Sequence, residues 1–342
     1  MYINPEGSLM SEPRPAERLI GLMTGHWVSA AIYVMAELGL ADRIRAGVVS
    51  TQRLAAEQDL YERSVYRLLR ALAGIGLVEE TGTREFALTP MGELLRSDHP
   101  RSMRPSILFQ GSPTHWKGWG NLIHNVRTGE SAFENAHGMS FFEYCKAHPE
   151  FGERFNNAMS TGAGATSAAV AEAYDFAGIS TLVDVGGGHG NLLTTILARF
   201  PRLNGILTDL PEVVAGAVAP AALEGRMRVV PGDFFESVPP GDAHILKNVI
   251  HDWDDARATA ILNVVRRATL DSGRLLIVEA IVPEGNAPSF AKMIDLEMMH
   301  ATPGGVQRTE RELAKLFYST GFRLERVIET SSMASVLEAR PV

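Results

Sequence analysis

An apolar strand runs directly into a glycine-rich loop at residues 182–191, which read Leu-Val-Asp-Val-Gly-Gly-Gly-His-Gly-Asn. A helix-forming run, Leu-Leu-Thr-Thr-Ile-Leu-Ala, follows at 192–198. Glycines at such a junction let backbone N–H groups approach a ligand closely, because no Cβ atoms stand in the way. The junction therefore indicates a nucleotide-like cofactor, without indicating which one.

The junction opens a region in which strands and helices alternate. We expect strands at 181–185, 205–208, 227–230, 243–246, 274–279 and 323–328, with helical patterns between most of them. This alternation predicts an α/β fold with a parallel, doubly wound sheet, whose ligands lie at the carboxyl ends of the strands.

Residues suited to a nucleoside follow the expected strands. Asp209 follows the second strand, where a carboxylate can accept hydrogen bonds from ribose hydroxyls. Asp233 and Phe234 follow the third strand, where a carboxylate can accept from an adenine amine and an aromatic ring can stack on the base. Two acids with few cations suit a nucleoside that lacks phosphates, such as S-adenosylmethionine, which carries positive charge.

A dinucleotide such as NAD is the alternative cofactor. Its pyrophosphate is normally bound by Gly-x-Gly-x-x-Gly, whereas the glycines here run Gly-Gly-Gly-x-Gly. No Lys-Ser/Thr pair of a P-loop follows them, which disfavours ATP hydrolysis.

The fourth expected strand leads into Lys-Asn-Val-Ile-His-Asp-Trp at 247–253. His251 is a candidate general base, because a neutral imidazole can take the proton of a phenol, whose pKa is about 10. A structural histidine at a strand end is the alternative. No two histidines and a carboxylate show the spacing of metal ligands, so we expect no metal site.

Length and composition limit the class of protein. A chain of 342 residues favours two domains, and 45% hydrophobic with 21% charged residues is typical of a globular protein. The single cysteine, Cys145, excludes a disulfide framework and suits the cytoplasm. A net charge of −8 argues against a nucleic-acid partner. We expect neither a signal peptide nor a membrane-spanning run, because charged residues or glycine interrupt each apolar candidate.

The N-terminal part has its own pattern. Residues 17–46 predict helices with a broad apolar surface, which usually needs a partner. Residues 50–95 predict a helix capped by Ser50, a second helix and a β-hairpin, which is the winged helix-turn-helix arrangement. The second helix and the residue before it carry Arg63, Arg67 and Arg70, so DNA binding is an alternative. Nearby glutamates weaken the positive field that a phosphate backbone needs: Glu62, Glu79, Glu80 and Glu85. A structural or dimerising role is the prediction.

Five motifs together resemble a known family. They are Asp-Val-Gly-Gly-Gly-x-Gly at 184–190, Asp-Leu-Pro at 209–211, Gly-Asp-Phe-Phe at 232–235, Lys-x-x-x-His-Asp-Trp at 247–253 and Pro-Gly-Gly-x-x-Arg-Thr at 303–309. In this combination the chain resembles the S-adenosylmethionine-dependent O-methyltransferases of the plant caffeate and bacterial antibiotic-tailoring type. The resemblance covers nearly the whole chain. It implies a winged-helix dimerisation domain at 1–100, a helical connector that contributes to the substrate pocket at 101–175 and a Rossmann-like catalytic domain at 176–342.

The resemblance implies a set of site residues. The cofactor-binding residues would be Asp184, Gly186, Gly188, Asp209, Leu210, Asp233, Phe234, Lys247 and Asn248. His251 would be the base, with Glu279 on its other ring nitrogen. The plant enzymes carry a second glutamate in Gly-Gly-x-Glu-Arg-Thr, where this chain has Gln307. A glutamine can accept a hydrogen bond but adds no negative charge, which suggests a more acidic hydroxyl or a larger part for proximity and orientation.

The substrate pocket follows in the same way. Its expected residues are Trp116, Phe155, Met159, Asp252, Met298, Met299 and His300. The alternatives are that the Met and Phe side chains and His300 belong to the core, and that Asp252 caps the next helix. An aromatic, apolar lining implies a flat and mostly uncharged substrate: a phenol, naphthoate, phenazine or aromatic polyketide.

These features predict a homodimeric O-methyltransferase that acts on an aromatic hydroxyl of a small secondary metabolite. One alternative keeps the fold and cofactor but hydroxylates or decarboxylates without methyl transfer. The other is a DNA-binding regulator that senses a small molecule.

Overall fold

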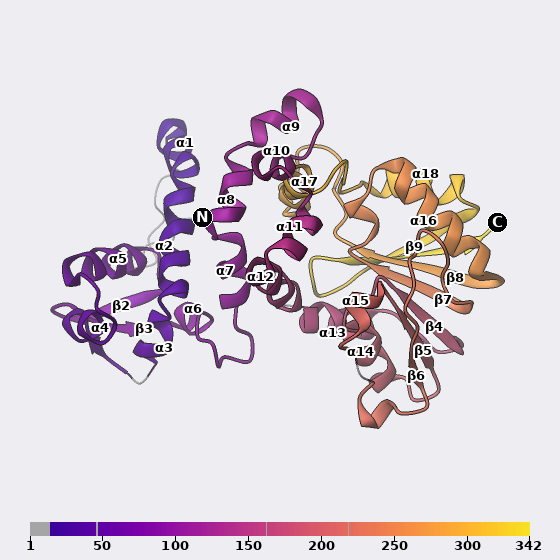
Figure 1. The fold of residues 1–342 in the computed structure, drawn as a ribbon, viewed down its shortest axis with the longest axis horizontal. Helices are drawn as coiled ribbons and strands as arrows, with labels where there is room; N and C mark the ends of the chain where they lie inside the picture. The colour runs from indigo at the N-terminus through magenta and orange to yellow at the C-terminus, as the bar shows by residue number, and fades with distance from the viewer. Residues whose placement is uncertain (1–13, 46, 162, 218) are drawn as a thin grey trace. The chain divides into compact units, whose positions relative to one another are not determined.

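The computed structural model describes residues 14–45, 47–161, 163–217 and 219–342 (Figure 1). The chain divides into two compact units, which differ from the predicted boundaries by an exchange of segments. The first comprises the described residues of Met1–Trp116 and Glu153–Thr161, and the second those of Lys117–Gly152 and Gly162–Val342. The functional division at 1–100, 101–175 and 176–342 stays a prediction.

The first unit contains the expected helices and hairpin. Its elements are α1 (Pro15–Met23), α2 (Gly25–Glu37), α3 (Leu40–Ile44), β1 (Val49–Ser50), α4 (Thr51–Gln58), α5 (Glu62–Gly74), β2 (Val78–Gly82), β3 (Glu85–Leu88), α6 (Pro90–Glu93) and α7 (Arg104–Gln110), with parts of α8 (Pro113–Trp119) and α12 (Pro149–Ser160). Ser50 caps α4 as predicted, since its side chain accepts from the Arg53 N–H at 3.3 Å. The small sheet has the order β1-β3-β2, and helices pack on it through buried Leu54, Leu69 and Phe86.

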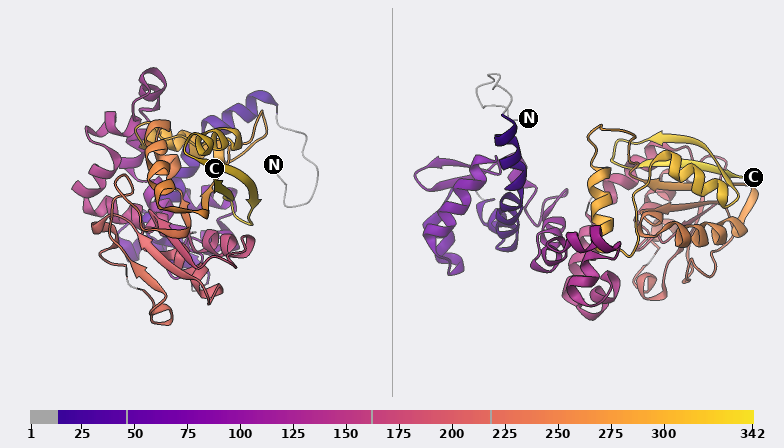
Figure 2. Two further views of the ribbon diagram at one scale, coloured as in Figure 1. Left: turned by 90° about the vertical axis from the view of Figure 1, so that its right-hand side faces the viewer. Right: turned by 90° about the horizontal axis from the view of Figure 1, so that it is seen from above.

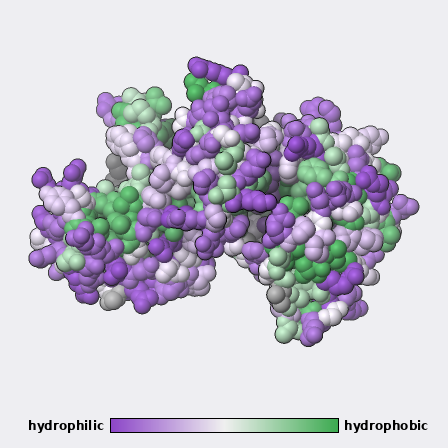
Figure 3. All heavy atoms as spheres, in the orientation of Figure 1, coloured by the Kyte–Doolittle hydropathy of each residue, from purple (hydrophilic) through white to green (hydrophobic). Residues whose placement is uncertain are grey.

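Residues 15–37 correct one expectation. Among the described residues they form the single helical stretch that is long and apolar enough to cross a membrane, judged by length and composition alone. The prediction that charged residues or glycine interrupt every such run does not hold here. Residues 19–36 contain no charged side chain, and Gly21 and Gly25 lie within the stretch without ending it. Apolar residues of α1 lie on the surface, where Figure 3 shows green side chains. A helix that packs against another protein meets the same description.

The second unit contains the helices α9 (Leu122–Thr128), α10 (Ala132–His137), α11 (Phe141–Ala147) and α13 (Ala163–Ala173), followed by an α/β region. That region comprises β4 (Thr181–Val185), α14 (Asn191–Arg199), β5 (Asn204–Thr208), α15 (Pro211–Val214), η1 (Ala221–Leu223), β6 (Met227–Val229), β7 (Gly241–Lys247), η2 (Ile250–Asp252), α16 (Asp255–Ala268), β8 (Thr269–Glu279), α17 (Ala291–Ala301), α18 (Glu310–Ser319), β9 (Phe322–Glu329) and β10 (Ser335–Pro341). All six expected strands are found.

The seven strands form one sheet in the order β6-β5-β4-β7-β8-β10-β9. The prediction of a parallel sheet is confirmed for β6, β5, β4, β7 and β8, and it needs one correction, since β10 is antiparallel to both β8 and β9. The strand β10 was not predicted, because its buried run includes a charged residue, Glu338. Continuous apolar runs, not charged ones, are the usual signal of a strand covered on both faces.

Helices cover both faces of this sheet (Figures 1 and 2). On one face, α13 and α14 pack on Leu182 and Leu207. On the other, α16 and α18 pack on Val183 and Ile206. Neighbouring strand residues thus enter opposite cores, as the two-residue period of a strand requires. The doubly wound prediction is confirmed.

Candidate active site

The predicted cofactor residues lie at one edge of the large sheet. Strands β6, β5, β4, β7 and β8 are neighbours and run parallel, so their carboxyl ends share that edge. In strand order, the strand ends and the segments after them carry Asp233 and Phe234, then Asp209 and Leu210, then Gly186 and Gly188, then Lys247 to Asp252, and finally Glu279. This is the edge where an open α/β sheet binds ligands.

The glycine loop after β4 is shaped for close approach. Gly188 has φ +58°, in the left-handed region that favours glycine. A Cβ at Gly187 would lie 2.5 Å from Leu207 Cδ1 and 2.6 Å from the Asp184 carboxylate, so no side chain fits there. The loop is tied to the next strand, because Asp209 Oδ2 accepts from the Gly188 N–H at 2.8 Å.

Asp209 keeps capacity for a ligand. Its other oxygen, Oδ1, accepts from the Leu210 N–H at 2.7 Å. A carboxylate oxygen has two acceptor sites, so each oxygen retains one. The carboxylate is half-buried and Leu210 is exposed. Asp209 can therefore accept from two adjacent hydroxyls while it holds the glycine loop.

Asp184 lies below the loop and is 1% exposed. Burial raises the pKa of its carboxyl to about 7, although the charge of Lys247 acts in the opposite direction. Within the part of the chain that the structure describes, its Oδ2 has no hydrogen-bond partner. A buried carboxyl group with one unpartnered oxygen, beside a glycine cradle, suits a ligand that carries positive charge, as S-adenosylmethionine does.

The segment after β6 brings aromatic rings to the same edge. Asp233 Oδ1 accepts from the Phe235 N–H at 2.8 Å and so fixes the turn. Phe234 borders the glycine loop, since a Cβ at Gly186 would lie 3.5 Å from its Cε1. Phe235 packs edge-on against Trp253 with ring centroids 4.9 Å apart. Half-buried rings beside a carboxylate match what an adenine requires.

The chain turns sharply between β7 and η2. Asn248 has φ +54°, which is uncommon for a residue other than glycine, and its N–H donates to the Val278 carbonyl at 3.1 Å. Such backbone strain concentrates at functional sites. The turn ends the strand at Lys247 and starts the short helix that carries His251.

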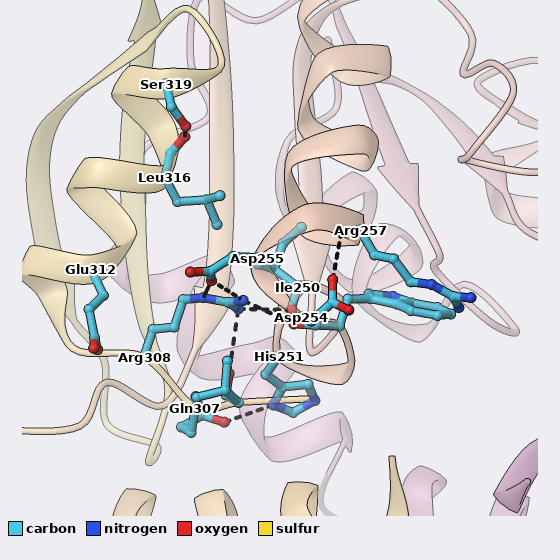
Figure 4. A network of polar contacts seen from close by, with 12 residues as sticks. Ile250, His251, Asp254, Asp255, Arg257, Gln307, Arg308, Glu312, Leu316 and Ser319 are labelled. Atoms are coloured by element: carbon cyan, nitrogen blue, oxygen red, sulfur yellow. Dashed lines mark hydrogen bonds and ion pairs between the residues drawn. The ribbon is translucent and has the colours of Figure 1, made fainter. Parts of the chain in front are cut away.

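His251 is held in one orientation by Gln307 (Figure 4). Gln307 Oε1 lies 2.8 Å from His251 Nδ1, and the Gln307 amide nitrogen donates to the Ala280 carbonyl. Because that amide group is engaged, Oε1 must face the ring and accept. Nδ1 then carries the hydrogen of the neutral ring, and Nε2 keeps a free lone pair.

Glu279 holds the backbone of this segment, which differs from the prediction that it binds a ring nitrogen of His251. Its Oε1 accepts from the His251 backbone N–H at 3.0 Å. The difference arises because β8 ends beneath η2, while the ring points toward the loop that carries Gln307. Burial raises the pKa of the Glu279 carboxyl, against the opposing effect of His251.

The environment of His251 makes the ring more basic than usual. Burial alone lowers the pKa of the imidazole, but the Asp252 and Glu279 carboxylates and the hydrogen bond with Gln307 outweigh it. Lys247 opposes them weakly. The pKa of His251 is therefore raised.

Two further residues of the 303–309 motif build the frame of the site, and the sequence analysis gave them no role. Arg308 is 2% exposed and donates to the Ile250 carbonyl at 3.1 Å and the Trp253 carbonyl at 2.9 Å (Figure 4). Gly305 is a close approach, since a Cβ there would lie 2.8 Å from the His251 carbonyl oxygen and 3.0 Å from that of Asp252. The sequence signal for both residues was their position in the motif at 303–309.

The predicted substrate residues fall into both units. Trp116, Phe155 and Met159 belong to the first and Asp252, Met298, Met299 and His300 to the second. Phe155 packs on Phe109 with centroids 5.4 Å apart, and Met159 is exposed. The capping alternative for Asp252 is wrong, because Asp254 caps α16 by accepting from the Arg257 N–H at 2.8 Å.

The methionines and His300 lie at the end of α17. Met298 is buried and Met299 half-buried. The His300 ring is fully buried and stacks on Trp119 with centroids 5.4 Å apart. This placement is typical of a core histidine, and a substrate contact for His300 stays a prediction.

Comparison with known proteins agrees with this geometry. A family model described as an O-methyltransferase domain matches residues 119–323, and one described as an O-methyltransferase dimerisation domain matches residues 20–98. Phenazine O-methyltransferase PhzM of Lysobacter antibioticus is 42% identical over 328 residues, which cover 95% of this chain and 96% of that protein. O-demethylpuromycin-O-methyltransferase of Streptomyces alboniger is 38% identical over 337 residues, which cover 95% of this chain and 89% of that protein.

A solved structure supports the same assignment. The O-methyltransferase NcsB1 from neocarzinostatin biosynthesis, in complex with S-adenosylmethionine and 2-hydroxy-5-methyl naphthoic acid, matches with a TM-score of 0.81 at 31% identity. The match covers 97% of this chain and 100% of that one. The chain therefore belongs to the O-methyltransferase family and is an S-adenosylmethionine-dependent enzyme.

Proposed function

We propose that the enzyme methylates an aromatic hydroxyl of a small secondary metabolite, with His251 as general base. One observation carries the proposal. Gln307 holds Nδ1 of His251 at 2.8 Å, so that Nε2 is the free ring nitrogen, at the sheet edge that carries the cofactor residues. A group that removes the hydroxyl proton is what a phenol needs to become a good nucleophile.

Different cofactor residues would bind different parts of S-adenosylmethionine. Asp209 would hold the ribose hydroxyls, and Asp233 with Phe234 would hold the adenine. Close backbone approach at Gly186 and Gly188 suits the methionine part, and the remaining contacts would come from Asp184, Leu210, Lys247 and Asn248. When bound, S-adenosylmethionine supplies the electrophilic methyl group.

A flat aromatic acceptor is supported by two lines of reasoning. The relatives named above act, by their names, on a phenazine and on O-demethylpuromycin, and the matching structure holds a naphthoic acid. The residues that the family resemblance implies for the substrate are mainly aromatic rings and methionines: Trp116, Phe155, Met159, Met298 and Met299, with His300 and Asp252 as polar members. Such a lining favours apolar rings that carry few charges.

The test is His251→Ala, assayed on a panel of phenols, naphthoates and phenazines. We expect turnover to fall by about 10²–10⁴-fold, because that is the usual contribution of a general base. Cofactor affinity, measured by calorimetry with S-adenosylhomocysteine, should stay unchanged. Undiminished turnover would leave a mechanism by proximity alone.

The same assay separates methyl transfer from its alternative. A product heavier by one methylene, released together with S-adenosylhomocysteine, identifies a methyltransferase. A hydroxylated or decarboxylated product would identify a different tailoring reaction on the same fold.

We also infer that the enzyme is a cytoplasmic homodimer, joined through a winged-helix-like N-terminal domain. The match of residues 20–98 to a dimerisation domain and the helix–helix–hairpin order of α4, α5, β2 and β3 support this inference. The single cysteine suits a reducing compartment. The DNA-binding alternative would require a steep salt dependence in a gel-shift titration.

A further inference from the structure

Asp252 faces the free nitrogen of the base. Its Oδ1 lies 3.6 Å from His251 Nε2, and its side chain is 26% exposed. Among the described residues, its side chain has no other recorded partner than the His251 ring. Since Asp254 caps α16, Asp252 has no part in the start of that helix.

The charges around the ring are unevenly placed. On the Nδ1 side, Gln307 is neutral. Glu279 directs its carboxylate at the His251 backbone N–H and lies near the Arg308 guanidinium, which reduces its effect on the ring. Lys247 adds an opposing positive charge. Asp252 is therefore the acid whose carboxylate faces a ring nitrogen of His251 most directly.

We propose that Asp252 is the charge partner of His251 and supplies, on the Nε2 side, the negative charge that Gln307 does not supply on the Nδ1 side. The proposal rests on the role of His251 in the proposed function. When Nε2 takes the proton of the acceptor hydroxyl, the resulting imidazolium has Nδ1–H directed at Gln307 and Nε2–H beside Asp252. The positive charge therefore forms next to a carboxylate, and the proton leaves to solvent when the ring returns to its neutral form.

Asp252 is a positioning residue in this scheme, since it acts through His251. The effect of Asp252 on the ring does not require an acceptor, because the two groups are adjacent in the acceptor-free protein. The pKa of His251 in the acceptor-free enzyme is thus the decisive quantity.

The experiment measures that pKa by NMR in the complex with S-adenosylhomocysteine, on protein labelled with ¹³C at histidine Cε1. The signal is assigned with His251→Gln. We expect Asp252→Asn to lower the pKa of His251 by about one unit or more, because an opposite charge at this distance shifts a pKa by about 1–3 units. Asp252→Glu, which keeps the charge, should hold the pKa near the wild-type value.

Asp254→Asn is the matched control. It removes a carboxylate two residues away, and asparagine caps a helix as well as aspartate does. Its His251 pKa should stay near that of the wild type. A His251 pKa that Asp252→Asn leaves unchanged or raises would overturn the proposal.

The reciprocal measurement does not depend on the folding of Asp252→Asn. In His251→Gln, the pKa of the ¹³C-labelled Asp252 carboxyl should rise, because the imidazolium that stabilises its charged form is gone. An unaltered Asp252 pKa contradicts the proposal. Neither titration needs an acceptor. If His251→Ala kept full turnover, the proposed function would be overturned, whereas the two pKa measurements would still test the pairing of Asp252 with His251 on their own.

Discussion

At the scale of single residues, Gln307 determines which nitrogen of the base is free. It accepts from His251 Nδ1 and donates to the Ala280 carbonyl. Gln307→Met keeps the length of the side chain and removes both bonds. We expect kcat to fall about fivefold, because a neutral hydrogen bond contributes about 1 kcal/mol and 1.4 kcal/mol is a factor of ten. Steady-state kinetics checks this, with unchanged S-adenosylhomocysteine affinity as control; a wild-type kcat would show that the ring is oriented without Gln307.

Asp209 carries the second prediction for a single side chain. Asp209→Ala should raise the dissociation constant of S-adenosylmethionine by about 10–100-fold, since hydrogen bonds to a charged group contribute about 1.5–3 kcal/mol. Calorimetry measures it. Asp242→Ala is the control, because Asp242 also accepts from backbone N–H groups, those of Ser180 and Thr181, at the amino end of β4. Equal losses in both variants would deny Asp209 a specific role.

The sequence identified the members of the site better than their roles. His251, Glu279 and Gln307 all meet around one short helix, as the motifs imply. Which acceptor faces the ring and which the backbone depends on a loop more than 50 residues farther along the chain. The local sequence pattern does not show how that loop approaches the histidine. Glu279 was therefore predicted to bind the ring, and Gln307 was described only by the negative charge that it lacks.

At the scale of elements, the strand that the sequence analysis missed is joined to its neighbours by a buried acid. Glu338 of β10 is 3% exposed and accepts from Arg326 of β9 at 2.7 Å. Burial alone raises the pKa of Glu338, but the Arg326 guanidinium outweighs burial and holds the pKa below its usual range. A lowered folded-state pKa stabilises the fold above the unfolded-state value of about 4.3, and this stabilisation is lost as the pH falls below it.

Glu338→Gln should therefore destabilise the protein by about 1.5–3 kcal/mol at pH 7, the range for hydrogen bonds to a charged group. The difference from the wild type should shrink as the pH falls below about 4, where the wild-type carboxylate is itself protonated. Urea unfolding at several pH values measures both. A difference independent of pH would assign the effect to packing.

The loop that precedes α18 depends on a glycine. Gly305→Ala would place a Cβ 2.8 Å from the His251 carbonyl oxygen, and the loop or η2 must shift. We expect a loss of about 1–3 kcal/mol in unfolding free energy, as for other overpacked sites, together with reduced turnover. Gly164→Ala is the control, since a Cβ there meets nothing within 4 Å. Thermal unfolding and kinetics test the pair; a fully active Gly305→Ala would show that the loop has room to move.

At the scale of the whole molecule, the sequence predicted two domains, six strands of the large sheet and the order of the candidate site residues along that sheet. Those features follow from local periodicity and from residues placed after strands. The antiparallel strand and the exchange of residues 153–161 into the first unit depend on contacts between distant segments. Neither leaves a periodic signal in the sequence.

The helices α1 and α2 expose an apolar surface of the kind that usually binds a partner. Leu22 is 72% exposed, Met23 65% and Trp27 65%, within a run that is apolar enough for a membrane. The match of residues 20–98 to a dimerisation domain favours a second copy of the chain. Water-exposed apolar surface of this extent is costly at about 25 cal/mol per Å², so a subunit that covers it gains stability.

The variant Leu22→Glu with Trp27→Glu should therefore sediment as a monomer, whereas the wild type sediments as a dimer. Tyr318→Glu, at an equally exposed aromatic in α18, should leave the dimer intact. If the wild type is monomeric and floats with lipid vesicles, while the double variant does not, the surface binds a membrane instead.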